Sequence, residues 1–358
     1  MPLNSGKYSI LGIMSGTSLD GLDLALCEFD KKGDLYGFKM VKSQTVSYSE
    51  KQKNKLKNAY ELNVESYFRL HHLFGKYIAK EINHFLKDGV KPDAIASHGH
   101  TIFHQPKMGF STQIGCGATI AALTGITTVC DFRSVDVALN GQGAPLVPLG
   151  DKLLFPQYKS CLNLGGIANI SFDDKNNKRL AFDICPANMG LNYFAQKTGA
   201  DYDKNGELSR EGNCHNDLLN DLNALGFYKL KGAKSLGREW FETIFLPLVE
   251  KHNLEIKDTL CTLTHHAAKQ IAGVLTDTEI KNVFITGGGA HNVFLLEILK
   301  SYFKGEIILA NTILINFKEA LIFAFLGMLR MNNQINTLSS VTGAKNDSVA
   351  GAVYLAFK

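Results

Sequence analysis

Several signatures of common protein classes are missing from this 358-residue chain. The seven cysteines form no Cys-x-x-Cys pair, so they predict reduced, mostly buried thiols and not disulfides or a zinc site. The net charge is only +4, and lysine and arginine are spread along the chain. This charge pattern argues against a nucleic-acid partner and is compatible with a small anionic substrate.

Long apolar segments are also missing. The longest apolar run, Ala320 to Leu329, is far shorter than the roughly 20 residues that span a bilayer. No basic stretch leads into an apolar segment near residue 1, so a signal peptide is not expected. We therefore expect a soluble cytoplasmic protein with no membrane partner, and the sequence leaves a homodimer open. The length predicts about two domains.

The nucleotide-binding motifs that are easiest to recognise are missing too. The chain has no G-x-x-x-x-G-K-[ST] P-loop and no G-x-G-x-x-G that opens a helix. What it has instead is a glycine-rich stretch at residues 12–23, reading GIMSGTSLDGLD, between two apolar runs. These runs predict strand, tight turn, strand, in which glycines expose backbone N–H groups.

Hydroxyls and carboxylates lie side by side in this first turn. Ser15, Thr17 and Ser18 supply hydroxyls, and Asp20 and Asp23 supply acids. Amides and hydroxyls beside carboxylates suit a phosphate with its Mg²⁺, which Asp20 would hold directly or through water. The alternative is an ordinary polar hairpin turn, in which the same residue types are common.

Hydrophobic periodicity predicts a mixed α/β unit in the first third of the chain. Strands are expected at 8–14, 22–29, 37–47, 94–97 and 127–131, with helices at 64–86 and 117–124. A Gly/Pro-rich segment at 140–149 predicts a hinge or an ordered loop.

A second unit repeats this order of elements. Strands are expected at 159–164, 167–172, 179–182 and 283–286, and helices from about 186, at 237–252, 257–275 and 349–357. A second glycine turn lies between the first two of these strands, and a third, Gly287 to Asn292, leads from a strand into a helix. We expect residues 1–135 with about 345–358 as domain I and residues 136–344 as domain II.

Three glycine turns distributed over two units are stronger evidence than one, because a nucleotide held by two domains needs phosphate contacts from each. The early turns have the strand–turn–strand arrangement of the actin-like sugar-kinase and Hsp70 ATPase superfamily. The chain resembles anhydro-N-acetylmuramic acid kinases almost end to end. The motifs that carry this resemblance are residues 12–23, SHGHTIFH (97–104), DFR (131–133) with Asp136, GQGAPLVP (141–148), NLGGIAN (163–169), KSLGRE (234–239), TGGGAHN (286–292), EA (319–320) and VTGA (341–344).

The resemblance implies two actin-like, ribonuclease H-like domains with mixed sheets that flank a nucleotide and substrate cleft. It also implies an enzyme of peptidoglycan recycling. Such kinases convert 1,6-anhydro-N-acetylmuramic acid, ATP and water to N-acetylmuramic acid 6-phosphate and ADP, with Mg²⁺. One turnover opens the 1,6-ether and phosphorylates the freed O6.

Two acids carry the chemistry that this family implies. Asp183 ends a predicted strand and would take a proton from the water that attacks C1; the alternative is an acid that caps the following helix. The family's Asp-Thr-Gly-Pro reads Asp183-Ile184-Cys185-Pro186 here, which puts rate and nucleotide geometry in question. Glu319 is carried over as a helper to Asp183, or else is an acid at a helix start favoured by the macrodipole.

The sugar site is expected around Arg133, whose planar guanidinium can hold the lactyl carboxylate in a bidentate manner. Its alternative is an ion pair with Asp131 or Asp136. The other residues expected to bind the sugar are His98, Gln142, Gly143, Ala144 and Asn188. The residues expected to bind ATP are Gly16, Thr17, Ser18, Leu19, Asp20, Gly21, Leu22, Asp23, Asn163, Gly165, Gly166, Gly287, Gly288, Gly289 and Asn292.

Three histidines, His98, His100 and His104, also raise the question of a metal site, but no Cys or acid ligand lies nearby in the sequence. A hydrogen-bonding role is favoured over metal binding. Two other functions stay open: a kinase of the same superfamily for another sugar or for acetate, and a non-catalytic ATP-gated binding module. The binding module is less expected, because a chaperone-like module would need a peptide-binding domain after the last predicted helix.

Overall fold

The computed structural model describes residues 6–16, 19–230 and 232–357. The chain forms two compact units: unit 1 is Met1–Pro156 with Phe317–Lys358, and unit 2 is Gln157–Asn316. This division differs from the predicted domains, because residues 136–156 and 317–344 belong to unit 1. The side chain of Ile322 lies against Gly150, which ties the two added segments to each other.

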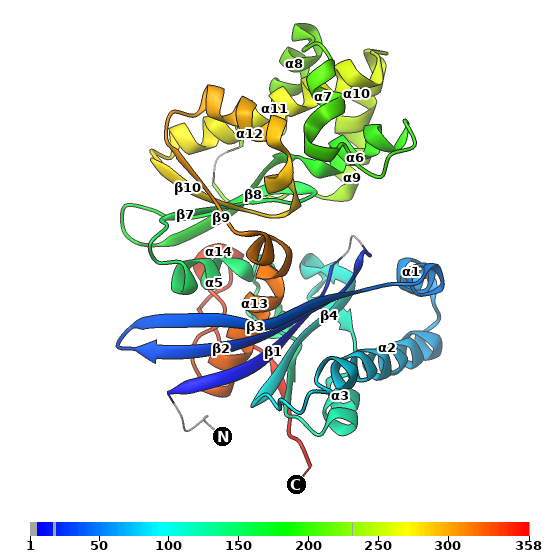
Figure 1. The fold of residues 1–358 in the computed structure, drawn as a ribbon, viewed down its shortest axis with the longest axis vertical. Helices are drawn as coiled ribbons and strands as arrows, with labels where there is room; N and C mark the ends of the chain where they lie inside the picture. Colours follow the sequence, from blue (N-terminus) through cyan, green and yellow to red (C-terminus); the bar gives the residue numbers. More distant parts are fainter. Residues whose placement is uncertain (1–5, 17–18, 231, 358) are drawn as a thin grey trace. The chain divides into compact units, whose positions relative to one another are not determined.

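Unit 1 is built on a mixed sheet with the order β12-β6-β4-β1-β2-β3, and β5 pairs with the far end of β4 (Figure 1). The first three strands form an antiparallel meander, whereas β4 runs parallel to β1 and β6 runs parallel to β4. The described strands of this sheet are β1 (Lys7–Ser15), β2 (Gly21–Lys32), β3 (Leu35–Ser47), β4 (Ala94–Gln105), β5 (Phe110–Ile114), β6 (Thr128–Cys130) and β12 (Ala352–Tyr354).

Helices cover both faces of this sheet. Helix α2 (Val64–Phe85) and helix α3 (Gly117–Thr124) bury their apolar sides with Leu11 and Ile13 of β1 in one cluster. On the other face lies helix α13 (Thr312–Met331), whose Ala320 carbonyl lies so close to Gly12 that a Cβ there would be 1.9 Å from it. Gly12 is therefore required by the close approach of this helix to β1.

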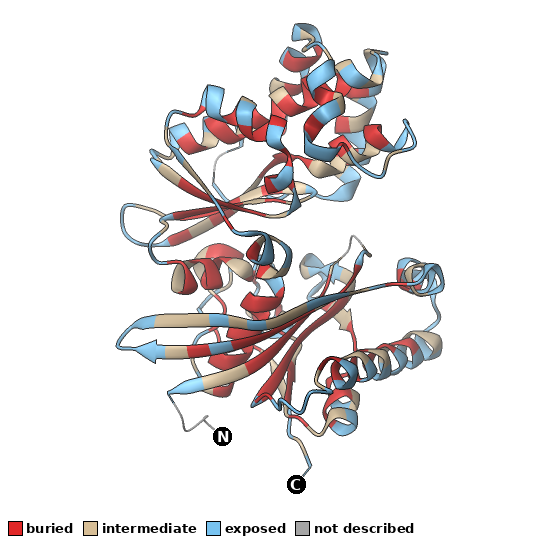
Figure 2. Cartoon of the chain, in the orientation of Figure 1, coloured by how far each residue is buried: buried red, intermediate tan, exposed pale blue. Residues whose placement is uncertain are grey.

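Helix α13 is long and apolar enough to cross a membrane by length and composition alone. In this fold 67% of its most apolar stretch is buried, and Figure 2 shows the buried residues along it. Phe325 packs against Phe29 of β2, and Gly327 approaches Ala96 of β4. These contacts are those of a core helix under a sheet.

Unit 2 repeats the sheet of unit 1. Its order is β11-β10-β7-β8-β9, with an antiparallel meander on one side and two parallel strands on the other. The strands are β7 (Ser160–Leu164), β8 (Ile167–Asp173), β9 (Arg179–Pro186), β10 (Asn282–Thr286) and β11 (Glu306–Leu309). This is the order β6-β4-β1-β2-β3 of unit 1, so the predicted repeat and the mixed α/β fold class are confirmed.

The helices of unit 2 bury two apolar clusters. Helix α11 (Ile256–Asp277) and helix α12 (Val293–Tyr302) pack Ile271 and Leu295 with Leu162 of the sheet. The second cluster lies among the shorter helices and includes Phe194, Leu218 and Phe245. The remaining described helices are α1 (Glu50–Lys57), α4 (Ser134–Ala138), α5 (Val147–Leu154), α6 (Asn188–Gln196), α7 (Glu207–Glu211), α8 (Asn216–Asn223), α9 (Arg238–Trp240), α10 (Leu246–Lys251) and α14 (Ser339–Thr342).

Two predicted helices differ from the structure. The helix predicted at 349–357 is wrong: residues 352–354 form β12, which pairs antiparallel with β6 in unit 1. The helix predicted at 237–252 is interrupted by a π-helical turn, Phe241–Phe245, between α9 and α10. Pro247 follows this turn and has no N–H to donate within a regular helix, which accounts for the irregularity.

Candidate functional site

The first glycine turn joins β1 to β2. The backbone closes with a hydrogen bond from Leu19 N–H to the Gly16 carbonyl, 3.3 Å. Asp20 is exposed at its end, and Gly21 and Leu22 already belong to β2, where they pair with β3. Two predicted ATP-binding residues, Thr17 and Ser18, lie outside the described residues. The predicted strand–turn–strand structure is confirmed for the rest.

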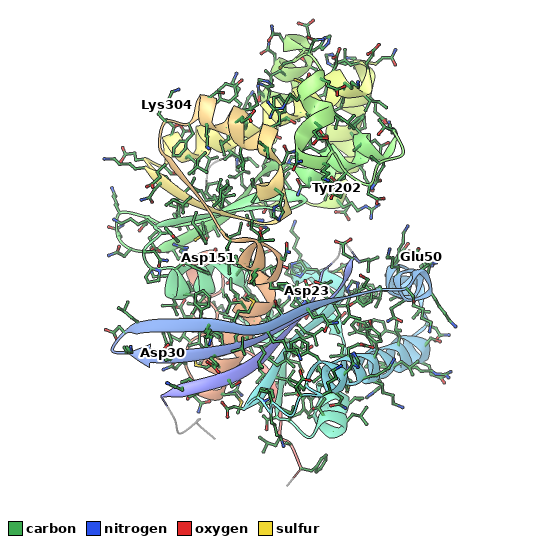
Figure 3. All side chains as sticks on the ribbon, viewed as in Figure 1. Asp23, Asp30, Glu50, Asp151, Tyr202 and Lys304 are labelled. Carbon is green, nitrogen blue, oxygen red and sulfur yellow. The ribbon has the colours of Figure 1, made fainter. Side chains whose placement is uncertain are left out.

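Asp23 lies just inside β2 and is labelled in Figure 3. Its Oδ1 accepts a hydrogen bond from Thr45 Oγ1, 2.6 Å. Burial raises the pKa of Asp23, the Thr45 hydroxyl opposes this, and the charge of Asp20 adds to the rise. Two carboxylates therefore lie near each other at this turn, and a cation would relieve their repulsion.

Ser15 does not offer its hydroxyl to a ligand as the sequence suggested. Its buried Oγ accepts from Tyr48 OH at 2.7 Å and lies 3.0 Å from Nδ1 of His100. Tyr48, directly after β3, and His100 of β4 thus hold the base of the first turn. The role of Ser15 is thus to anchor the turn.

The three histidines of β4 do not converge. Between Ile13 and Ser15 the register of β1 with β4 shifts, and Gly99 adopts a positive φ of 72°. The bulge places His98 against Phe323 of α13, whereas His100 meets Phe74 of α2 on the opposite face. Within the part of the chain that the structure describes, no group of three or more His, Cys, Asp or Glu could hold a metal.

Arg133 lies half-buried directly before α4 and bonds to neutral acceptors. Its Nε and Nη2 lie 3.1 and 2.8 Å from Nε2 of His98, and its Nη1 donates to the Gly143 carbonyl at 2.6 Å. Burial lowers the pKa of Arg133 to about 10, which the charges of Glu319 and Asp136 oppose. No carboxylate of the described residues forms an ion pair with it, so the alternative of a salt bridge to Asp131 or Asp136 is wrong.

The loop at 141–144 is held by contacts that the sequence did not suggest. Asp136 is fully buried: its Oδ2 accepts from Gly143 N–H at 2.7 Å and its Oδ1 accepts from Thr342 Oγ1 at 2.6 Å. Gln142 N–H donates to the Thr342 carbonyl, 2.8 Å. The backbone N–H groups of Gln142 and Gly143 are thus engaged within the protein. That Gln142, Gly143 and Ala144 line the sugar site stays a prediction. Asp136 and Thr342 both lie in family motifs, which was the available signal.

Glu319 lies within α13 and not at a helix start, so the macrodipole alternative is wrong. The residue as a whole is exposed. Surrounding protein nevertheless raises the pKa of Glu319 by desolvation, and Asp23 adds to the rise, while Lys318 and Arg133 oppose it. Lys318 itself is buried in an ion pair with Asp151 at 2.7 Å, which fixes this turn of α13 on α5.

The second and third glycine turns meet within unit 2. A Cβ on Gly287 would lie 2.5 Å from Asn163 Oδ1, and one on Gly289 would lie 2.9 Å from the Leu164 carbonyl. The Gly165 and Gly166 carbonyls accept from the first amides of α6, and Asn188 Nδ2 donates to the Leu164 carbonyl at 3.2 Å. Six predicted residues therefore gather here: Asn163, Gly165, Gly166, Gly287, Gly289 and Asn188.

The two remaining predicted residues of the third turn differ from each other. Gly288 is exposed, and the nearest atom to a Cβ there would be Asn188 Nδ2 at 3.9 Å. Asn292 is buried and caps α12, because its Oδ1 accepts from Leu295 N–H at 2.9 Å. The side chain of Asn292 thus orders the helix behind the turn.

Asp183 lies inside β9, not at its end, because this strand continues to Pro186. Its Oδ2 accepts from Leu236 N–H at 2.8 Å, and its own N–H donates to the Lys234 carbonyl. Burial raises the pKa of Asp183, and the Leu236 amide opposes this. The helix-capping alternative is wrong, because the side chain is held by residues 234–236 and α6 begins only at Asn188.

A register shift explains how Ile184 and Cys185 are accommodated. Asp183 pairs with Asn169 and Cys185 pairs with Ala168, so Ile184 is the extra residue of a bulge. Both side chains are buried in the apolar core of unit 2. These two residues therefore pack into the core, and the Asp183 carboxyl keeps its bond to Leu236.

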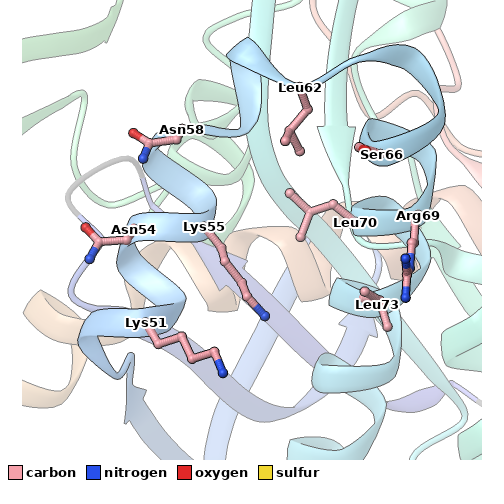
Figure 4. Close-up of a pocket in the computed structure, with 9 residues that line it drawn as sticks. All are labelled: Lys51, Asn54, Lys55, Asn58, Leu62, Ser66, Arg69, Leu70 and Leu73. Atoms are coloured by element: carbon pink, nitrogen blue, oxygen red, sulfur yellow. The ribbon is translucent and has the colours of Figure 1, made fainter.

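The groove drawn in Figure 4 lies elsewhere in unit 1, between α1 and α2. It is lined by Lys51, Asn54, Lys55, Asn58, Leu62, Ser66, Arg69, Leu70 and Leu73. None of the residues predicted to act on a sugar or a nucleotide is among them.

Comparison with known proteins accounts for nearly the whole chain. Residues 8–356 match the family described as anhydro-N-acetylmuramic acid kinase. The chain belongs to this family. Relatives named anhydro-N-acetylmuramic acid kinase include one from Legionella pneumophila (strain Lens), 35% identical over 367 residues, with 96% of this chain and 97% of the relative covered. One from Pasteurella multocida (strain Pm70) is 36% identical, with 96% of each covered.

Among solved structures, the chain is similar to the activator of the 2-hydroxyisocaproyl-CoA dehydratase from Clostridium difficile with bound ADPNP. The two are 14% identical with a TM-score of 0.45, and the match covers 89% of this chain and 95% of the activator.

The crowding at the third turn gives a testable prediction. Gly289→Ala should lower the free energy of unfolding by about 1–3 kcal/mol, because its Cβ would press on the backbone of Leu164. Gly288→Ala is the matched control and should change it by less than about 0.5 kcal/mol, because its Cβ would make only an ordinary contact, 3.9 Å from Asn188 Nδ2. Urea unfolding followed by circular dichroism measures both. Equal effects of the two substitutions would contradict the described packing.

Proposed function

We propose that the chain is an ATP-dependent kinase that opens 1,6-anhydro-N-acetylmuramic acid with water and phosphorylates O6. The products are N-acetylmuramic acid 6-phosphate and ADP, which places the enzyme in peptidoglycan recycling. The observation that carries this proposal is the family match over residues 8–356, which includes every glycine turn and both acids described above. The relatives carry the same name at about 35% identity over 96% of the chain.

Asp183 is the general base of this proposal. Burial raises the pKa of the Asp183 carboxyl, which makes it a better proton acceptor. The hydrogen bond from Leu236 N–H fixes the orientation of this carboxyl. The proton of water passes to Asp183 as the water oxygen bonds to C1. The C1–O6 bond breaks, and O6 takes the γ-phosphoryl group of ATP while ADP leaves.

Glu319 is the helper in this scheme. Desolvation raises the pKa of its carboxyl, the charge of Asp23 adds to the rise, and Lys318 and Arg133 oppose it. Such a carboxylate can accept a hydrogen bond from the attacking water while Asp183 takes the other proton of that water.

We assign the nucleotide to the glycine turns. In unit 2, the second and third turns leave Gly165, Gly166 and Gly288 without bulky side chains beside Asn163 and Asn188. Bare backbone of this kind allows a phosphate or ribose to approach closely. In unit 1, residues 16 and 19–23 of the first turn would face the phosphates.

The residues present fit Mg²⁺, which proteins often bind through one or two carboxylates with the substrate phosphates supplying the rest. Asp20 is exposed and close enough to raise the pKa of Asp23, so the first turn holds two acids of this kind. Asp20, with Asp23 behind it, would hold the ion. When bound, Mg²⁺ would neutralise the charge of the phosphates.

The sugar is assigned to Arg133 and the residues around it. The guanidinium forms no ion pair with an acid among the described residues, so it can donate to the lactyl carboxylate of the substrate. We further propose that the enzyme acts in the cytoplasm, without nucleic acid or membrane; a homodimer stays open. A sugar or acetate kinase of other specificity, and an ATP-gated binding module, are the alternatives that the first experiment separates.

The first experiment supplies the purified chain with ATP, Mg²⁺ and 1,6-anhydro-N-acetylmuramic acid in water enriched in ¹⁸O. ADP release should depend on the anhydro sugar, and mass spectrometry should find one ¹⁸O at C1 of the phosphorylated product, because water attacks there. N-acetylglucosamine and acetate are the control acceptors. ADP release with either control but not with the anhydro sugar would contradict the proposal, and so would an unlabelled C1.

Asp183→Asn tests the base. The amide keeps an oxygen that can accept from Leu236 N–H but cannot take a proton, so kcat should fall by about 10²–10⁴-fold with thermal stability retained. Asp217→Asn, an exposed aspartate on α8, is the matched control and should have wild-type kcat. A kcat within threefold of wild type for Asp183→Asn, about 0.7 kcal/mol, would exclude this assignment.

The pH dependence of kcat follows from the same residue. The carboxylate is the active form, so kcat should fall as the pH decreases through the pKa of Asp183. Because burial raises that pKa, the midpoint of the acidic limb should lie above 3.8, the ordinary value for an aspartate. The limb should persist in Glu319→Gln. Loss of the limb in that variant would transfer the titration to Glu319.

A further inference from the structure

The donors of Arg133 can be counted. A guanidinium has five N–H groups. Three of them point to protein acceptors: the Nε–H and one Nη2–H to His98 Nε2, and one Nη1–H to the Gly143 carbonyl. Among the described residues nothing else accepts from it. One N–H on each Nη therefore remains, and these two donors are available to an anion such as a carboxylate.

His98 has no ring nitrogen left for a substrate. Its Nδ1 lies 2.9 Å from the Gly99 carbonyl, which can only accept, so Nδ1 carries the proton. Its Nε2 is then the acceptor for Arg133. Desolvation and the charge of Arg133 hold the pKa of His98 well below its usual value, in keeping with this neutral tautomer. The ring is buried and packs on Phe323 at 4.7 Å between centroids.

A second chain of contacts fixes the other side of the guanidinium. The Gly143 carbonyl that accepts from Nη1 belongs to a residue whose N–H donates to Asp136, and Asp136 accepts from Thr342 as well. Gly143 has a positive φ of 65°, and a Cβ there would lie 2.8 Å from Val137 Cγ2. The carbonyl is thus held in place by a buried carboxylate and by backbone that only glycine accommodates readily.

We propose that His98 and Asp136 are positioning residues that orient Arg133, and that this arrangement makes the sugar site selective for a sugar bearing a carboxylate. The sequence predicted that His98 contacts the sugar; in this proposal it acts on the sugar only through Arg133. The inference rests on the proposed function. Its physical basis is that the two groups that accept from Arg133, His98 Nε2 and the Gly143 carbonyl, are neutral. The guanidinium is therefore held in position while its charge stays available to an anion.

The test compares two sugars that differ only in the lactyl group. The kcat/KM of each variant is measured for 1,6-anhydro-N-acetylmuramic acid and for 1,6-anhydro-N-acetylglucosamine, which lacks the carboxylate. His98→Leu removes the acceptor and should reduce the ratio of the two values by about tenfold or more, through the KM for the acidic sugar. His98→Gln retains an acceptor oxygen near the position of Nε2 and should keep the ratio within about threefold of wild type.

A residue that is merely structural would lower both values together and leave the ratio unchanged, and that result would overturn the proposal. If the wild-type rate on the neutral sugar is below detection, the KM and kcat for the acidic sugar are used alone. A rise in KM with kcat within threefold supports the proposal, and a fall in kcat with unchanged KM overturns it. A wild-type chain that phosphorylates neither sugar contradicts the proposed function itself.

Thr342→Val supplies a second variant in case His98→Leu does not fold. The substitution keeps the shape of the side chain and removes the hydroxyl that donates to Asp136. The ratio should move in the same direction by about threefold to tenfold, because the Gly143 carbonyl loses part of its support. If the ratio of the two kcat/KM values is unchanged in a folded Thr342→Val protein, Asp136 does not position Arg133.

Discussion

The parallel pairing of β7 with β10 is the constraint on which unit 2 depends. Thr286 pairs with Asn163, so both strands end at the same edge of the sheet and their glycine turns must share the space beyond it. Gly287 and Gly289 then lie so close to Asn163 and Leu164 that no Cβ fits. The glycines at positions 287 and 289 of the third turn follow from this register.

The two units use one sheet plan with different polar anchors. In unit 1 the turn after β1 is held at its base by Tyr48 and His100 through Ser15. In unit 2 the turn after β7 is held by the first amides of α6. The acids also differ in support, because Asp183 is oriented by a backbone amide whereas Asp23 is oriented by the Thr45 hydroxyl. The repeat therefore preserves strand order and not individual contacts.

The sequence predicted features that depend on local pattern, and these included the strand meanders, helices α2 and α11, the three glycine turns and the repeated element order. It failed where a contact distant in the chain decides the structure. Residues 352–354 form a strand because they pair with β6 at the edge of the sheet. Glu319 lies within α13 because this helix begins at Thr312, before the apolar run at 320–329. The role of His98 depends on Arg133, 35 positions away, and no spacing rule indicates such a pair.

The support of Arg133 joins residues that are far apart in the chain. Asp136 takes a hydrogen bond from Thr342, 206 positions later. Unit 2 is one uninterrupted segment, whereas unit 1 needs residues from both sides of it. Since domains fold as they leave the ribosome, unit 2 can become compact before residues 317–358 of unit 1 are added. Arg133, although it is translated early, gains this support only after residue 342 has been added.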